Sequence, residues 1–510
     1  MRLDNAVQRP RLNSRWFNQD RVYHAVYGLA LTVSISTWFI AVRAPLWLDE
    51  TGSYGQIAKG FSGILSRQYD LTFPAYSYIL WLSSQIIGTS EVALRVPSIL
   101  AMLGAVYLLY LAARELFDQD IAIIVAVLFC LHPIVIFLSI DVRPYAFAML
   151  TTNAAIYFLV RLRRDSSSRL AVLFGFSAAA IVWFHFLFIV ILPALALSYF
   201  AVKNCDRRTL WRQFAVALAA FTAALLPVVP GFLTLFRTRE SHVFEQAPNL
   251  LDLEVTFGYG HLLTPYALAG FVAFLALAFA TWPRAKKAPK GWKILVCASL
   301  GLIPILILYG VSTETTIHMF IPRHRVIAIP GIALCWALVF SRFSSRPLRL
   351  LLCVVFVAMS TWQILSSPSS REHGYTWKYA LDYAEENASL DGAPILICSD
   401  FPEADSVTMP VNSAKDSRHF AQLSYYRLTV PVVPMPRSLN SEAVRVGSQF
   451  LQQAAGKHER FLALAFRPSY GVIDWLAQNA TTTYLVRNLG VFDGVEVVEF
   501  EPRIEPNPAR

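Results

Sequence analysis

The 510-residue sequence is poor in charged residues, which make up only 15% of the chain. Soluble globular domains carry about 25% charged and about 45–50% apolar residues, whereas here 55% of the residues are hydrophobic. This shortage of charge excludes an ordinary soluble protein and predicts an integral membrane protein. The net charge of +10 does not indicate a nucleic-acid-binding protein, because the basic residues are scattered in short clusters between apolar runs.

Cysteine is also scarce, with six residues in the whole chain, and only Cys398 lies in the polar C-terminal region. No disulfide framework follows from that distribution. The C-terminal region lacks a glycine-rich phosphate loop and any metal-ligand spacing. The sequence therefore requires no cofactor, although a divalent metal ion is a candidate. A small-residue cleavage site is missing after the first apolar run, which predicts an uncleaved first span.

Long apolar runs fill the first two thirds of the chain, and a membrane helix needs about 20 mostly apolar residues. About 11 transmembrane helices are predicted, at residues 23–43, 94–113, 120–139, 144–160, 170–185, 187–202, 212–235, 262–282, 294–311, 325–341 and 348–365. The segment 73–88 is apolar too, but it is short and rich in Tyr and Trp. We interpret it as a surface helix within an external loop, residues 44–93, with a twelfth span as the alternative.

Basic residues are distributed unevenly between the two sets of connecting loops. Loops on the side of the N-terminus include two strongly basic ones, at residues 161–169 and 284–293, whereas the other side holds fewer lysines and arginines. Basic loops stay on the cytoplasmic side of a membrane. The sequence thus predicts a multi-pass protein of the cell inner (plasma) membrane, with its N-terminus in the cytoplasm and its C-terminus in the periplasm.

After about residue 368 the composition becomes that of a soluble domain. Short apolar runs alternate there with helical patterns, and Ser441 is the predicted cap of one helix. The predicted strands are APILICS, RFLALAF, TTTYLVRNLG and VEVVEFE. We therefore expect a polytopic α-helical membrane domain at 1–368 and a periplasmic α/β domain at 369–510, which caps the site or helps to choose the acceptor.

Ionisable residues are nearly absent from the predicted spans but gather at their outer ends. Removing a charge from water is costly, so ionisable groups near membrane spans need a reason. The set consists of Asp49, Glu50, Asp141, Arg143, His185, His318, Arg323, His324 and Arg325. Each has an ordinary explanation when taken alone, such as a solvated helix end, a surface ion pair or a packed histidine. Together, on one side of the membrane, they predict a site.

Two acidic and two cationic positions suit the transfer of a group from a phosphate-bearing lipid. A carboxylate accepts the proton of an attacking hydroxyl, and the planar fork of arginine matches phosphate oxygens. Asp49 is the candidate general base, and Glu50 and Asp141 are further candidate catalytic residues. The candidate ligands of the donor phosphate are Arg143, Arg323, His324 and Arg325. The substrate pocket is expected to include Tyr145, His185 and Tyr54.

Two motifs in the first 200 residues resemble a known family. They are LWLDE at the end of the first span, with FPAYSYILWLSSQIIGTSEVALRVP after it, and LHPIVIFLSIDVRPYAF. Both resemble the protein O-mannosyltransferase and lipid A aminoarabinose transferase superfamily of GT-C glycosyltransferases. The resemblance implies a polyprenyl-phosphate sugar donor, transfer with inversion on the periplasmic side, and a glycan, lipid or protein acceptor. Beyond residue 200 it extends only to the general layout of residues 200–365.

The resemblance assigns roles by position. Asp49 matches the family's essential acid after the first span, and Asp141 matches its second acidic position. Arg143 and Tyr145 match an Arg-x-Tyr element, and Arg323 or Arg325 would match the cation near the lipid phosphate. One departure concerns residues 71–73, where Leu-Thr-Phe stands in place of the acid and lysine of the aminoarabinose branch. That branch's metal ligand and phosphate-binding lysine are therefore not carried over to this chain.

A membrane transporter or lipid flippase is the alternative to a glycosyltransferase. Transporters place ionisable or helix-breaking features near the bilayer midplane and often have repeated halves. The sequence shows neither, although Pro193 and the pair Pro227 and Pro230 interrupt predicted spans. A membrane anchor for the α/β domain is a third possibility, and it leaves the charges at the outer ends unexplained.

Overall fold

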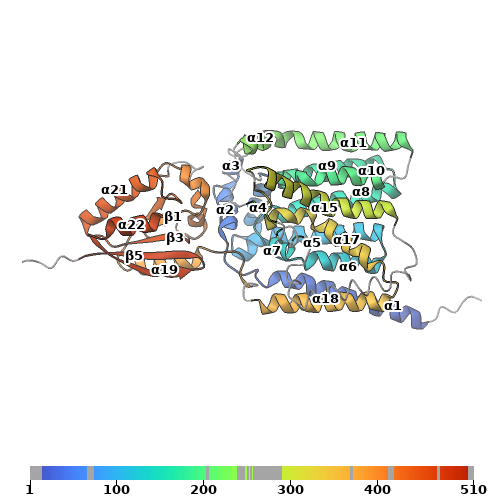
Figure 1. Ribbon diagram of the computed structural model, residues 1–510, viewed down its shortest axis with the longest axis horizontal. Coiled ribbons are helices and arrows are strands. Elements are labelled where there is room, and N and C mark those ends of the chain that lie inside the picture. The colour runs from blue at the N-terminus through green and yellow to red at the C-terminus, as the bar shows by residue number, and fades with distance from the viewer. Residues whose placement is uncertain are drawn as a thin grey trace, which may run out of the picture.

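In the computed structural model a bundle of helices runs side by side, and an α/β domain lies beyond one end of it (Figure 1). The structure describes residues 14–65, 74–202, 206–237, 247–249, 252, 256, 290–316, 318–367, 371–411, 419–467 and 471–503. The bundle consists of α1 (Ser14–Ser36), α5 (Glu91–Leu116), α6 (Gln119–Cys130), α7 (Pro133–Ser139), α8 (Tyr145–Arg164), α9 (Ser168–Phe184), η2 (Phe186–Ile191), α10 (Leu192–Val202), α11 (Arg207–Leu225), η3 (Leu226–Val228), α12 (Val229–Arg237), α15 (Gly291–Glu314), α16 (Pro322–Arg325), η7 (Val326–Ala328), α17 (Ile329–Phe340) and α18 (Arg346–Ser366).

The predicted count of about 11 spans is not supported. Within the described residues, six helices are long and apolar enough to cross a membrane, or seven if the bent pair α6 and α7 forms one span. The run 170–202, predicted as two spans, breaks at His185 into short pieces, and α9 has only 17 residues. At 1.5 Å per residue α9 is about 25 Å long, less than the roughly 30 Å of a hydrocarbon core. The predicted span 262–282 lies outside the described residues.

A sharp bend between α6 and α7 shapes the end of the bundle that faces the α/β domain. The two helices meet at 72°, where Pro133 starts α7 and the Nδ1 atom of His132 accepts a hydrogen bond from the backbone of Ile134 at 3.3 Å. The carbonyl oxygen of Cys130 accepts a bond from the Trp38 indole at 3.0 Å, which satisfies one of the carbonyls left free at this helix end. The bend directs α7 toward the turn that carries Asp141.

Three short helices lie across this end of the bundle, between it and the α/β domain (Figure 1). They are α2 (Leu48–Ile57), α3 (Gly60–Leu65) and α4 (Pro74–Ile87). The 14 residues of α4 give a length of about 21 Å, too short to cross a bilayer. This length agrees with our interpretation of residues 73–88 as a helix that does not span.

The C-terminal domain is a five-stranded mixed sheet with helices on both faces, which confirms the predicted α/β class. Its elements are α19 (Lys378–Ala388), β1 (Ile395–Cys398), η9 (Pro402–Ser406), α20 (Ala421–Tyr425), β2 (Val432–Met435), α21 (Ser441–Lys457), β3 (Phe461–Phe466), α22 (Val472–Ala480), β4 (Tyr484–Phe492) and β5 (Val495–Pro502). The strand order is β2-β1-β3-β5-β4, with β2, β1 and β3 parallel and β5 antiparallel to both β3 and β4.

The four predicted strands are confirmed, and β2 is the strand that the sequence did not reveal. Its residues include Pro434, and proline within a short run argues against a strand unless the strand lies at a sheet edge, as β2 does. The predicted cap of α21 is off by one residue, because Asn440 and not Ser441 accepts the bond from the backbone N–H of Ala443. Asparagine is as good an N-cap as serine.

The α/β domain and the bundle share a hydrophobic cluster. One face of the sheet packs against α19, and Leu48 of α2 is buried in the same cluster with Trp377 and Leu381. Polar contacts reinforce the junction: the Tyr426 hydroxyl accepts a bond from the backbone N–H of Leu46 at 2.7 Å, and the Thr376 hydroxyl donates to the Leu46 carbonyl at 2.9 Å. The α/β domain therefore holds the chain just before α2 through both the N–H and the carbonyl of Leu46.

Candidate active site

The first turn of α2 fixes the position of Asp49. Trp47 is the extended residue before the helix, and the Glu50 carboxylate accepts a hydrogen bond from the Trp47 backbone N–H at 3.2 Å. A glutamate at the third helical position that bonds back to the cap residue is a capping-box arrangement. Asp49 occupies the second helical position, where the N-terminal end of the helix dipole favours a negative charge.

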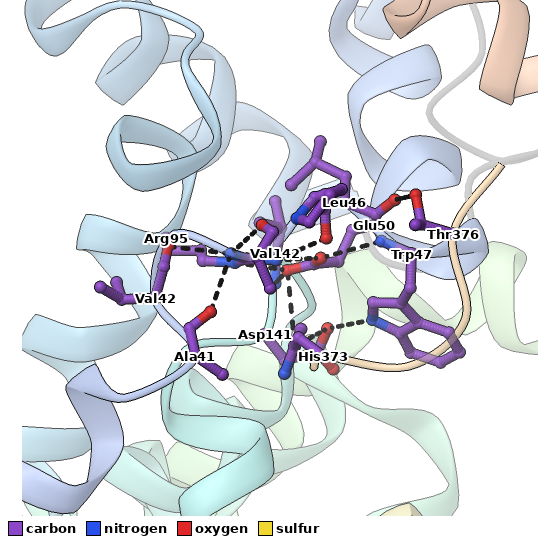
Figure 2. Close-up of polar contacts among 12 residues, drawn as sticks. Ala41, Val42, Leu46, Trp47, Glu50, Arg95, Asp141, Val142, His373 and Thr376 are labelled. Carbon is purple, nitrogen blue, oxygen red and sulfur yellow. Dashed lines mark hydrogen bonds and ion pairs between the residues drawn. The ribbon is translucent and has the colours of Figure 1, made fainter. Parts of the chain in front are cut away.

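Beneath this turn, Glu50 forms a fully buried ion pair with Arg95 of α5 (Figure 2). The Arg95 Nη2 and Nε atoms lie 2.7 and 3.1 Å from the two Glu50 oxygens. The Arg95 Nη1 atom donates to the carbonyls of Val42 and Ala44, at 2.9 and 2.6 Å. A single guanidinium thus holds both the carboxylate and the chain that leads into α2.

Glu50 was predicted as a catalytic residue, and its surroundings favour a structural role instead. Its oxygens accept bonds from Arg95, from the Trp47 backbone and from the backbone N–H of Val142 at 2.9 Å, and its side chain has no exposed surface. A carboxylate that is fully buried and surrounded by these donors cannot reach the hydroxyl of a substrate. We therefore interpret Glu50 as part of the scaffold under Asp49.

Asp49 lies above this scaffold, together with two of the predicted phosphate ligands. Its Oδ2 atom is 3.0 Å from Arg323 Nη1 of α16 and 4.0 Å from Arg143 Nη2, which lies between α7 and α8. The side chains of Asp49, Arg143 and Arg323 are 19, 16 and 29% exposed, whereas Glu50 and Arg95 are fully buried. The first three can meet a substrate, and the buried pair cannot.

Asp141 is buried and contacts the residue that caps α2. Its Oδ1 atom accepts a bond from the Trp47 indole nitrogen at 3.0 Å (Figure 2). The Nε2 atom of His373 lies 3.7 Å from the same oxygen and 3.6 Å from Glu50 Oε1. Asp141 therefore does not reach the partly exposed position occupied by Asp49, Arg143 and Arg323. Its contacts among the described residues do not include a surface that an acceptor could reach.

Glu50, Asp141 and His373 each offer one ligand atom within 4.8 Å of the others, a spacing at which a metal ion could be held. Asp141 Oδ2 and His373 Nε2 suit such a role because neither has a hydrogen-bond partner in the described part of the chain. Glu50 does not suit it, since both of its oxygens already face the Arg95 guanidinium. With two available ligands, the cluster does not fit a divalent ion, which usually needs more protein ligands.

The remaining predicted residues separate into two groups. Rings of Tyr145 and His185 lie 4.9 Å apart, and those of His185 and His324 lie 5.4 Å apart. The charges of Arg143 and Arg323 act on Tyr145 and His185, so this aromatic group lies beside the ion pairs of Asp49 with the two arginines. Two residues are elsewhere. Arg325 donates to the carbonyl of Asp252 at 2.6 Å, and Tyr54 packs against Tyr425 of the α/β domain.

Two important residues were missed from the sequence. Arg95 lies inside a predicted span, and an arginine there is a recognised sign of a functional or structural partner. That signal was available in SEVALRVPSILAM but was not used. His373 lies in the linker SSPSSREHGY, where no pattern distinguishes it from its neighbours.

Residues of the α/β domain also lie close to Trp47 and Asp49. The ring of Tyr375 lies 6.4 Å from that of Trp47, edge to face. Asp400 follows the carboxyl end of β1, and the charge of Asp49 acts on it. Burial raises the pKa of the Asp400 carboxyl, while a hydrogen bond from Tyr375 and the charge of Arg437 oppose that shift. The carboxyl ends of parallel strands commonly face ligands in α/β sheets.

Comparison with known proteins gives one family and one fold. Residues 72–233 match the family described as dolichyl-phosphate-mannose-protein mannosyltransferase. Among solved structures, ArnT from Cupriavidus metallidurans in the apo state is similar at 11% identity, with a TM-score of 0.53 over 92% of this chain and 97% of that chain. The same protein bound to undecaprenyl phosphate is similar at 10% identity, with the same TM-score and coverage. At such identities the likeness shows a shared fold. No curated protein sequence matches the chain.

Proposed function

We propose that Asp49 is the general base of this chain, a GT-C glycosyltransferase that uses a lipid-phosphate sugar donor. The match of residues 72–233 to the dolichyl-phosphate-mannose-protein mannosyltransferase family supports this enzyme class. The predicted resemblance and the predicted enzyme class are thereby confirmed. Fold likeness to ArnT bound to undecaprenyl phosphate supports a polyprenyl phosphate as the carrier of the sugar. The base, the direction of attack and the side of the membrane are our proposals.

The contact between Asp49 and Arg323 carries this proposal. It joins a carboxylate, the group that accepts a proton, to a guanidinium, the group that binds phosphate, at a partly exposed position. Arg143 adds a second guanidinium 4.0 Å from the same carboxylate oxygen. Segments far apart in the sequence supply these three side chains, and the outer ends of the bundle bring them together.

In the proposed reaction, an acceptor hydroxyl attacks the anomeric carbon on the face opposite the phosphate. The hydroxyl proton passes to Asp49, the new C–O bond forms, and the bond between the sugar and the phosphate breaks with inversion. The electron pair of that bond leaves with the polyprenyl phosphate, whose charge Arg323 and Arg143 stabilise. Glu50 and Arg95 take no part in the proton transfer, but keep the first turn of α2 in place.

The Asp49–Arg323 ion pair also suggests how the base is exposed. While Arg323 is paired with Asp49, the guanidinium lies 3.0 Å from the carboxylate Oδ2 atom and blocks that oxygen. A bound phosphate offers several charged oxygens to Arg323 and competes with Asp49 for it. Asp49 would then be released from Arg323 as the donor binds, so that its carboxylate can meet the acceptor hydroxyl only when the donor is present.

The assay that tests the function follows a radiolabelled polyprenyl-phosphate sugar incubated with the purified protein and membrane extract as the acceptor. We expect label to move into an acceptor and free polyprenyl phosphate to accumulate. A transporter or flippase would leave the donor intact while moving it across a vesicle membrane. Intact donor after prolonged incubation with every acceptor fraction would contradict the proposed transfer.

Arginine 323 is expected to bind the donor phosphate directly. We predict that Arg323→Ala weakens undecaprenyl phosphate binding by about 10- to 150-fold, because a hydrogen bond to a charged group contributes about 1.5–3 kcal/mol. Titration of the detergent-solubilised protein with undecaprenyl phosphate would measure this loss. Arg371→Ala is the matched control, since Arg371 is an exposed arginine near the same end of the bundle. Equal binding by the two variants would exclude Arg323 as a phosphate ligand.

We propose that this site and the α/β domain lie in the periplasm. The uneven distribution of basic residues supports this orientation, because the loop at 161–169 lies at the end of α8 opposite Tyr145. In a cysteine-free background, a cysteine at exposed Glu372 should react with an impermeant maleimide on intact cells. Lys290 is exposed and directly precedes the first residue of α15, at the end of that helix far from the site. A cysteine there should react only after permeabilisation. The reverse pattern would place the site in the cytoplasm.

A further inference from the structure

The linker between the membrane part and the α/β domain passes directly over the buried scaffold. It leaves α18 at Ser366 and enters α19 at Lys378, and the described residues 371–377 lie against the start of α2. Thr376 donates to the carbonyl of Leu46, as described above, and its backbone N–H donates to Asp493 of the sheet domain at 2.5 Å. This segment therefore touches the bundle and the α/β domain at once.

His373 is the residue of this linker that enters the scaffold (Figure 2). It is 2% exposed, and its ring stacks on Phe137 of α7 with centroids 4.2 Å apart and planes at 25°. Its Nε2 atom points between Asp141 and Glu50, at 3.7 and 3.6 Å. An imidazole held in this way limits the positions that the Asp141 carboxylate can adopt.

Two polar atoms at this contact lack partners. In the part of the chain that the structure describes, neither His373 Nε2 nor Asp141 Oδ2 makes a hydrogen bond. A buried polar group without a partner costs about 1–3 kcal/mol, and native proteins retain few of them. The contacts of His373 Nε2 with Asp141 Oδ1 and Glu50 Oε1, at 3.7 and 3.6 Å, are therefore the polar interactions that hold the imidazole beside these carboxylates.

A short chain of contacts connects His373 to the proposed base. Asp141 accepts the indole bond of Trp47, and Trp47 is the cap residue of α2, two positions before Asp49. Arg323 also lies over Trp47, with its guanidinium carbon 5.9 Å from the ring centroid. The linker contacts the same ring. Gly374 has φ +71°, and a Cβ atom there would lie 2.9 Å from Trp47 Cγ.

We propose that His373 is a positioning residue of the transferase: by fixing Asp141 and, through it, Trp47, it sets the first turn of α2 so that Asp49 faces the donor. This role rests on the proposed function of Asp49. It makes the linker a part of the active site, so that the α/β domain is needed for turnover even when donor binding does not depend on it.

The test compares two substitutions with a matched control. His373→Phe keeps a ring against Phe137 but removes the polar Nε2 atom, whereas His373→Gln can place an amide N–H near that position. His458→Asn is the control, because His458 is an exposed histidine of the α/β domain. Its φ is 53°, and asparagine tolerates this left-handed conformation. Each variant is purified as the full chain and its thermal unfolding is recorded to confirm folding.

We expect His373→Phe to lower the rate of polyprenyl phosphate release by about 10- to 100-fold, because a misplacement of about 1 Å can cost about 10²-fold in rate. Undecaprenyl phosphate binding should stay within about twofold of wild type, since Arg143 and Arg323 remain. His373→Gln should recover most of the lost rate, and His458→Asn should match wild type. A wild-type rate for His373→Phe, or an equal loss of phosphate binding and rate, would overturn the proposal.

Hydrogen exchange separates this proposal from the proposed function. Backbone amides of residues 46–54 should exchange faster in His373→Phe than in wild type or His373→Gln, whether or not the wild-type protein transfers a sugar. If the wild type releases no polyprenyl phosphate but exchange rises as expected, the proposed function fails and the positioning contact stands. If exchange in this segment is unchanged, the positioning role is refuted even when all transfer assays succeed.

Discussion

Asp49→Asn is expected to lower sugar transfer by about 10²–10⁴-fold, the range that a positioned general base contributes. Asparagine has nearly the same shape but cannot accept the hydroxyl proton at neutral pH. Binding of undecaprenyl phosphate should persist or become tighter, because Arg323 no longer has a carboxylate competing for it. Radiolabel transfer and phosphate titration, run on the same preparation, would measure the two effects separately.

Controls for this prediction come from a second acid and a second substitution. Asp382→Asn alters an exposed aspartate of α19 that pairs with Lys378, and it should leave transfer unchanged. Asp49→Glu retains a base but moves it by one methylene, so its activity should fall between those of wild type and Asp49→Asn. Undiminished turnover by Asp49→Asn would rule out Asp49 as the base, and the reaction would need a different proton acceptor.

Among the single substitutions considered in the membrane part, Arg95→Met should lower the free energy of unfolding the most. Removing one partner of a buried ion pair costs about 3–5 kcal/mol, because the other charge is left without compensation. Here the loss also frees the carbonyls of Val42 and Ala44. Thermal unfolding in detergent should occur at a markedly lower temperature, and transfer activity should fall with it because the first turn of α2 loses its support.

Two further variants distinguish the ion pair from the carbonyl contacts. Arg114→Met, at an exposed position of the same helix, should be close to wild type in stability. The double change Glu50→Gln with Arg95→Met removes the uncompensated carboxylate and should recover part of the lost stability. Recovery should remain incomplete, because no side chain then donates to the carbonyls. Wild-type stability of Arg95→Met alone would contradict the structural role given to this pair.

The convergence of Asp49, Arg143 and Arg323 followed from the sequence because the bilayer restricts where ionisable groups can lie. Apolar runs fixed which segments are helical, and the loops between them fell on one side or the other. The same reasoning could not rank Asp49 against Glu50, which are adjacent and chemically alike. Their difference comes from helix geometry, which turns one carboxylate toward Arg323 and the other inward to Arg95.

Hydropathy was a weaker guide to the number of spans than to their existence. The break at His185 was predicted, because the predicted spans 170–185 and 187–202 meet there. The bend at Pro133 was not predicted, since that proline lies within an uninterrupted apolar run. In the α/β domain, strands with continuous apolar runs were evident, whereas the edge strand β2 has a half-exposed pattern and a proline. His373 could not be found at all, because its importance depends on long-range contacts made by a linker.

The burial of Leu48 in the same cluster as Trp377 and Leu381 has a consequence for engineering chimeras. A domain grafted from a related protein would have to supply a matching cavity for this leucine, and hydrogen-bonding groups for the backbone of Leu46. Without them, the graft would expose an apolar face and loosen the helix that carries Asp49. The α/β domain therefore cannot be exchanged simply by joining two chains within the segment after α18; the recipient's α2 must be exchanged together with the new domain.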